Sequence, residues 1–100
     1  MVRNVFIATC FVSLGLLGLS AQAGTPSGQM LGNTCTGCHG NKGVSKGAAP
    51  SINKYSAEQM VQAMQDYKSG KRPGTIMDRI AKGYSDEEIK AMADFLTSMK

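Results

Sequence analysis

The chain has 100 residues, a formal net charge of +4 and only 6% aromatic residues, with no tryptophan. This length leaves no room for two ordinary domains. The 11 basic and 7 acidic residues are interspersed without a dense basic run. Because few aromatic rings are present to stack on bases, the composition argues against nucleic-acid binding.

The first predicted element is a cleavable targeting segment over residues 1–23. Arg3 supplies a positive charge, an almost wholly apolar run spans Val5 to Ser20, and the letters AQA precede Gly24. This order is typical of a secretory signal peptide. A membrane anchor is the alternative, but the apolar run is short for a span of about 20 residues. We expect cleavage after residue 23, a mature domain over residues 24–100, and a periplasmic location with no membrane attachment.

A short helix is expected to begin near Gln29 and run toward a cysteine cluster. Gly32 lowers its helix propensity by about 1 kcal/mol relative to alanine, and such a glycine often permits close approach by another helix. From Gly40 to Tyr55 the sequence is rich in glycine and includes Pro50. It predicts a long loop, and long loops without structure of their own are usually functional or wrapped around something.

A second helix is expected to begin after Ser56, because Gln59 three residues later completes a capping box. Gly70 is expected to end it. Residues 75–83 predict one or two helical turns.

The last helix is the clearest in the sequence. Ser85 and Glu88 form a second capping box, with acidic residues in the first turn where the helix dipole favours them. An apolar stripe follows at helical spacing and comprises Ile89, Met92, Ala93, Leu96 and Met99. No alternating pattern predicts a strand, so the expected fold class is all-α, with three to four short helices and long loops.

The mature chain offers little material for a core. Phe95 is its only phenylalanine, and six methionines serve as flexible fillers. A chain of this size buries a modest fraction of its surface and usually needs a disulfide, a metal or another added group to stabilise its core. The composition therefore indicates a cofactor.

Residues 35–40 read CTGCHG and are the chemical centre of the sequence. Zinc would need four ligands, and Cys35, Cys38 and His39 are the only cysteines and histidine of the mature chain. A redox dithiol expects a βαβ pattern that is absent here, and a disulfide would close a very short loop. Cys-x-x-Cys-His is the attachment signature of haem c. It predicts one covalent haem, with thioethers to Cys35 and Cys38 and iron ligation by His39.

The second iron ligand separates electron carriers from haem proteins with an open iron. No second histidine exists, so a methionine is expected, and Met77 follows a Pro-Gly turn that lets the chain cross the other haem face. The remaining methionines, or no protein ligand, are the alternatives. The carbonyl of Pro50, or one near it, is predicted to accept the second ring N–H of His39.

Two function classes follow from the iron site. With Met77 bound, the chain is a carrier of single electrons and not an enzyme; with an open iron, it is a haem sensor or peroxidase. No spare histidine is present to serve the second class. Basic side chains flank both ligand regions and are predicted to steer docking of a redox partner; they are Lys42, Lys46, Lys68, Lys71, Arg72, Arg79 and Lys82. An ordinary charged surface is the alternative.

In the order CTGCHG, Pro50, Met77 and a final amphipathic helix, the mature chain resembles class I cytochromes c. The resemblance implies a first helix crossing the last near Gly32 and Phe95, with haem held between the loops.

The stretch GTIMDRIAKGYS more specifically resembles the haem domain of the cytochrome subunits of flavocytochrome c sulfide dehydrogenases. That resemblance implies an FAD-containing sulfide dehydrogenase subunit as electron donor and a downstream redox acceptor. Some members of that family carry two haem domains, whereas this sequence has one motif. A free soluble carrier with another partner is therefore the alternative.

Overall fold

A computed structural model describes residue 24 and residues 26–99; the predicted signal peptide lies outside these residues. Four α-helices follow one another: α1 (Gly28–His39), α2 (Ala57–Ser69), α3 (Met77–Ala81) and α4 (Asp86–Ser98). A 3₁₀ turn, η1 (Asn41–Gly43), follows α1. The described part contains no strand, which confirms the all-α prediction. None of its helices is long and apolar enough to cross a membrane.

The helix starts follow the capping chemistry of the sequence. The side chain of Ser56 accepts a hydrogen bond from the Gln59 backbone N–H, and the Ser56 backbone N–H donates one to the side chain of Gln59. Ser85 and Glu88 make the same reciprocal pair. At the start of α1, the side chain of Ser27 accepts from the Met30 N–H. Gly70 ends α2 in the left-handed conformation, with φ 81° and ψ 3°.

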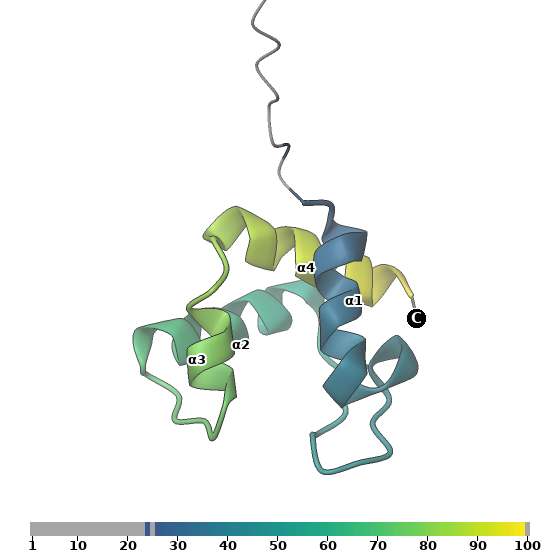
Figure 1. The fold of residues 1–100 in the computed structure, drawn as a ribbon, viewed down its shortest axis with the longest axis horizontal. Helices are drawn as coiled ribbons and strands as arrows, with labels where there is room; N and C mark the ends of the chain where they lie inside the picture. The colour runs from purple at the N-terminus through teal and green to yellow at the C-terminus, as the bar shows by residue number, and fades with distance from the viewer. Residues whose placement is uncertain (1–23, 25, 100) are drawn as a thin grey trace, which may run out of the picture.

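Helices α1 and α4 cross closely, as Figure 1 shows. The crossing depends on two glycines of α1. A Cβ atom on Gly32 would lie 2.5 Å from Cδ1 of Phe95, and one on Gly28 would collide with the backbone carbonyl of Ala91. The predicted contact between Gly32 and Phe95 is therefore confirmed.

The core forms where α2 meets α4. Met60 of α2 packs with Ala93 and Leu96 of α4, and Ile52 and Tyr55 of the long loop lie against them. Four of the five residues in the predicted α4 stripe are buried, the exception being the half-buried Met99. Helix α3 packs against α2, and the two helices lie on the opposite side of the molecule from α1 (Figure 1). The molecule thus has two halves. One half comprises α1 and the loop over residues 40–55, and the other comprises α2 and α3.

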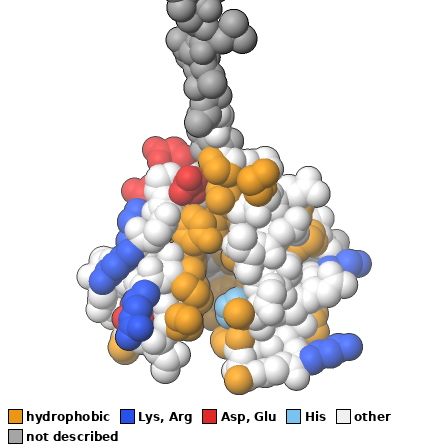
Figure 2. All heavy atoms as spheres, viewed as in Figure 1, with side chains coloured by type: hydrophobic (Ala, Val, Ile, Leu, Met, Phe, Trp, Pro, Cys, Tyr) orange, Lys and Arg blue, Asp and Glu red, His pale blue; other side chains and the backbone are white. Residues whose placement is uncertain are grey.

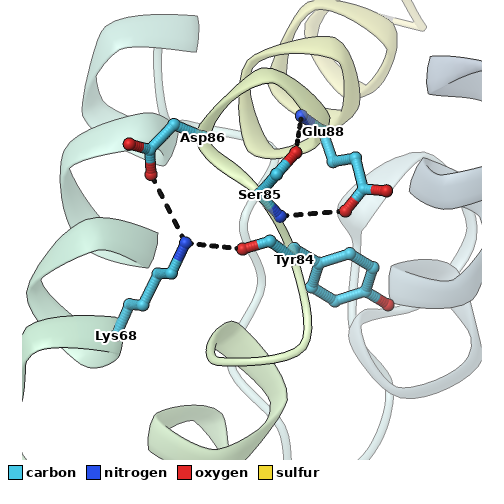
Figure 3. A network of polar contacts seen from close by, with 5 residues as sticks. All are labelled: Lys68, Tyr84, Ser85, Asp86 and Glu88. Atoms are coloured by element: carbon cyan, nitrogen blue, oxygen red, sulfur yellow. Dashed lines mark hydrogen bonds and ion pairs between the residues drawn. The ribbon is translucent and has the colours of Figure 1, made fainter. Parts of the chain in front are cut away.

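A polar network ties α2 to the turn between α3 and α4 (Figure 3). The Nζ of Lys68 donates to the backbone carbonyl of Tyr84 over 2.7 Å and lies 3.5 Å from the carboxylate of Asp86. The neighbouring Ser85 holds the first turn of α4 through its capping box. The network fixes the path of the chain between Met77 and the last helix.

Replacing Lys68 by methionine keeps the apolar stem and removes the charged donor. We expect the free energy of unfolding to fall by about 1–2 kcal/mol, because the half-buried carbonyl of Tyr84 loses a charge-assisted hydrogen bond. Lys90→Met is the matched control, since its ion pair with Asp94 is exposed, and its effect should stay below about 0.5 kcal/mol. Denaturant titration of both variants measures the difference, and equal losses would contradict a special role for Lys68.

Candidate functional site

The cysteine cluster occupies the last turn and a half of α1, and the histidine ends the helix. Cys35 is half-buried against the core cluster, whereas Cys38 is exposed and His39 is half-buried. Both thiols are free, so no disulfide joins them. Burial raises the pKa of the Cys35 thiol, which reports an apolar surrounding. The helix thus presents two thiols and an imidazole within five residues.

The loop after α1 brings a backbone carbonyl to the histidine. Nδ1 of His39 lies 2.6 Å from the carbonyl oxygen of Pro50. Because a carbonyl oxygen only accepts, Nδ1 carries the proton and donates it, which leaves Nε2 as the acceptor atom of the neutral ring. The ring is therefore held by one nitrogen while the other is available to a metal. This contact has the partners that the sequence predicts.

Backbone hydrogen bonds hold the loop in the shape that this contact needs. The carbonyl of Gly43 accepts the N–H groups of both Ile52 and Asn53, at 2.8 and 3.2 Å, and so closes the base of the loop. Gly40 has φ 84°, and a side chain there would collide with the carbonyl of Val44. The glycine following the histidine is thus required by the turn.

Met77, which is predicted as the second protein ligand of the iron, is the first residue of α3. Met77 is half-buried, and the Ile76 position before it provides no capping side chain. Two apolar side chains near Met77 in the sequence are exposed, Ile76 at 58% and Ile80 at 38%. Val44, which follows the Cys-x-x-Cys-His motif, is 47% exposed. These are three of the four large apolar side chains exposed in the described part, Met30 being the fourth.

Figure 2 shows a hollow between the two halves of the molecule, with His39, the only histidine, visible in it and apolar side chains on both sides. The six buried apolar residues of the described part make a small core, and the large apolar side chains of Val44, Ile76 and Ile80 remain exposed. Two thiols, an oriented imidazole and an apolar hollow fit a flat apolar group with a central metal. A second groove of about 590 Å³ lies between α2 and α4 and involves none of these residues.

Within the described residues, no group of three or more His, Cys, Asp or Glu side chains is arranged to hold a metal ion directly. The cytochrome c family model matches residues 27–100. The chain belongs to the cytochrome c family. This cytochrome therefore carries covalent haem c at the one Cys-x-x-Cys-His motif of the sequence, and it is an electron carrier. The predictions of fold and cofactor are confirmed.

Three known cytochromes or electron acceptors are similar in sequence to this chain. It is 42% identical over 72 residues to the cytochrome subunit of sulfide dehydrogenase from Chlorobaculum tepidum, covering 72% of this chain and 66% of that protein. It is 32% identical over 91 residues to cytochrome c-553 of Helicobacter pylori, covering 89% and 95%. The thiosulfate dehydrogenase electron acceptor of Stutzerimonas stutzeri is 30% identical over 69 residues, covering 65% and 32%. The cytochrome thus spans just under two thirds of the first relative's length.

Hydrogen bonds of Thr34 also support the site, and no sequence pattern predicts them. Thr34, the residue before Cys35, donates its hydroxyl proton to the carbonyl of Leu31 over 2.6 Å. Its oxygen therefore accepts from the Tyr84 hydroxyl, 3.3 Å away. This contact links α1 to the turn after α3, across 50 residues of sequence. No local pattern in the sequence indicates it.

Proposed function

We propose that this cytochrome is a periplasmic carrier of single electrons whose haem is attached at Cys35 and Cys38 and ligated by His39 and Met77. The observation that carries the proposal is the 2.6 Å contact between Nδ1 of His39 and the Pro50 carbonyl. It leaves Nε2 as the free nitrogen beside an apolar hollow. The signal-peptide pattern of residues 1–23 supports export, which agrees with attachment of haem c outside the cytoplasm.

The haem supplies an iron that alternates between ferric and ferrous states. The protein's part is to bind and orient it. The Pro50 carbonyl fixes the tautomer and plane of the His39 ring, and the thioether of Met77 favours the reduced state. The exposed apolar side chains of Ile76 and Ile80 lie close to Met77 in the sequence. Packed against a bound haem, they would help to exclude water from its methionine side. A carrier with both iron positions filled by protein does no chemistry on a substrate of its own.

The donor that we propose is an FAD-containing sulfide dehydrogenase subunit. The 42% identity to a cytochrome subunit of sulfide dehydrogenase supports this assignment. Oxidation of hydrosulfide (HS⁻) to zero-valent sulfur releases one proton and two electrons. The partner's flavin accepts both electrons. A one-haem carrier takes these electrons singly, so each sulfide reduces two molecules of this cytochrome. The reduced cytochrome then passes its electron to a downstream acceptor.

The experiment that tests this assignment uses holo-cytochrome purified from its native periplasm together with any bound flavoprotein. On adding sulfide, we expect the haem to be reduced at two haems per sulfide, at a rate that falls as salt is raised, because exposed basic side chains steer docking. The cytochrome stripped of flavoprotein is the control for direct reduction by sulfide. Reduction at the same rate in that control would contradict the assignment.

A free soluble carrier is the second candidate. It is favoured by the match to a cytochrome c-553 along 89% of this chain and 95% of that protein. In that case no flavoprotein co-purifies, and the cytochrome accepts electrons from donors unrelated to sulfide. The electron-carrier role and the site residues are the same under both candidates.

A further inference from the structure

Tyr84, which lies between α3 and α4, is bonded to three helices by three different groups. Its backbone N–H donates to the carbonyl of Ala81, the last residue of α3, over 3.3 Å. Its carbonyl accepts from the Nζ of Lys68 of α2 over 2.7 Å, and its hydroxyl lies 3.3 Å from Oγ1 of Thr34 of α1. The next residue, Ser85, is the N-cap of α4. Tyr84 therefore joins the four α-helices of the described part.

The backbone and the side chain of Tyr84 face opposite halves of the molecule. In Figure 3 the carbonyl of Tyr84 points toward Lys68, whereas the ring points the other way. The ring reaches α1, because its hydroxyl meets Thr34 there. The backbone N–H and carbonyl thus hold the residue to the half that comprises α2 and α3, and the hydroxyl carries a contact across to the other half.

The α1 end of this contact lies beside the haem attachment. Thr34 directly precedes Cys35, and it donates its own hydroxyl proton to the carbonyl of Leu31 over 2.6 Å. The Thr34 oxygen is thereby held in place, with its lone pairs turned to the Tyr84 hydroxyl. Among the other α-helices of the described part, α4 is the one against which α1 packs most closely. The contact at Thr34 therefore adds a direct link from α1 to the end of α3.

The two ends of this link bear on the two sides of the candidate haem site. Helix α1 carries the Cys-x-x-Cys-His motif, and α3 begins with Met77. A movement of α3 away from α1 would carry Tyr84 with it, because the Tyr84 N–H is bonded to the last residue of α3. The same movement would break the bond to Thr34. The hydrogen bond between Thr34 and Tyr84 therefore opposes separation of the two helices.

We propose that Tyr84 is a positioning residue whose hydroxyl, bonded to Thr34, holds α3 close to α1 and so keeps Met77 against the haem iron. This inference rests on the proposed ligand role of Met77. Thr34 is exposed and Tyr84 is half-buried, so water replaces the lost partner when the contact breaks, and the bond favours the closed form only moderately. The fraction of open molecules sets how quickly an added ligand reaches the iron.

The test measures the rate at which cyanide replaces the methionine in purified ferric holo-cytochrome. Tyr84→Phe removes the hydroxyl alone, and Thr34→Val removes its partner. We expect each variant to bind cyanide about three- to tenfold faster than the parent, as the loss of one hydrogen bond predicts. The double variant is expected to match the single variants, because both changes remove the same contact.

Two variants of α1 serve as controls. Thr36→Val removes a hydroxyl of the same helix whose bond, to the carbonyl of Asn33 over 2.7 Å, stays within α1. Thr34→Ser keeps the hydroxyl that meets Tyr84. Both are expected to bind cyanide within about twofold of the parent rate.

Hydrogen exchange of the α3 backbone amides in the same holo-proteins is a second readout. Exchange should quicken in Tyr84→Phe and Thr34→Val and stay at the parent rate in Thr36→Val. Circular dichroism establishes that each variant remains folded, and if Thr34→Val unfolds, Tyr84→Phe decides. Parent-like cyanide binding in Tyr84→Phe, or a folded Thr34→Val that behaves as the parent while Tyr84→Phe is fast, would overturn the proposal.

Met77→Leu separates this proposal from the ligand assignment. If Met77→Leu leaves the thioether–iron absorption band in place, the ligand assignment is wrong and the positioning role fails with it. If Met77→Leu abolishes the band while Tyr84→Phe and Thr34→Val behave as the parent, the ligand stands and only the positioning role is wrong.

Discussion

Replacing Met77 by leucine is expected to leave a folded cytochrome with an altered iron site. Leucine conserves the apolar volume at the start of α3 but has no sulfur to bind iron. The thioether–iron absorption band should vanish, carbon monoxide should bind the ferrous form readily, and the reduction potential should fall, because loss of the thioether removes a ligand that favours reduced iron. Peroxidase activity should rise by at least about tenfold as the iron opens. Absorption spectra and a redox titration measure these changes.

The control for this variant is Met30→Leu. Met30 is 65% exposed and lies five residues before Cys35, so its replacement tests whether any methionine near the motif affects the spectrum. We expect no change in band, potential or carbon monoxide binding. Persistence of the band in Met77→Leu, or its loss in Met30→Leu, would show that Met77 is not the ligand.

The second large effect is expected at the crossing of α1 and α4. Gly28→Ala places a methyl group against the backbone carbonyl of Ala91, which cannot move without displacing α4. Gly32→Ala meets the ring of Phe95, which can rotate away in part. We expect both to lower the free energy of unfolding, Gly28→Ala by about 3 kcal/mol and Gly32→Ala by somewhat less. For a small domain this is a large share of its stability.

Chemical denaturation of the holo-proteins tests that order. Adding Phe95→Val to Gly32→Ala removes the clashing ring atoms, so the double variant should lose less stability than the sum of the two single losses. No such coupling is expected between Gly28→Ala and Phe95→Val. Additive losses at Gly32 and Phe95 would contradict the close contact seen between them.

Local chemistry explains why much of the fold was predictable. The capping boxes at Ser56 and Ser85 and the glycine at position 70 set the bounds of α2 and α4, because each acts within three or four residues of the helix end. The motif likewise indicated the cofactor by itself, since attachment chemistry depends on the spacing of adjacent residues. The hydrogen-bond partner of His39 could also be predicted from the sequence, because the loop that contains Pro50 directly follows the histidine.

Other contacts near the site depend on how the helices pack, and the sequence did not indicate them. The hydrogen bond between Thr34 and Tyr84 joins residues 50 apart, and the tyrosine hydroxyl is equally consistent with several roles until the helices are placed. The contact of Lys68 with the carbonyl of Tyr84 likewise depends on how α2 and α3 pack. The helical turns predicted over residues 75–83 are shorter in the structure, where α3 spans Met77–Ala81 and begins without a capping side chain.

We propose that His39 and Met77 of this cytochrome occupy both axial positions of the haem iron. The most direct test is the absorption and magnetic circular dichroism of the purified ferric protein at neutral pH. We expect a low-spin, six-coordinate haem with a thioether–iron band that persists until the methionine is displaced. A high-spin, five-coordinate spectrum without that band would contradict it and would place the protein among haem proteins with an open iron.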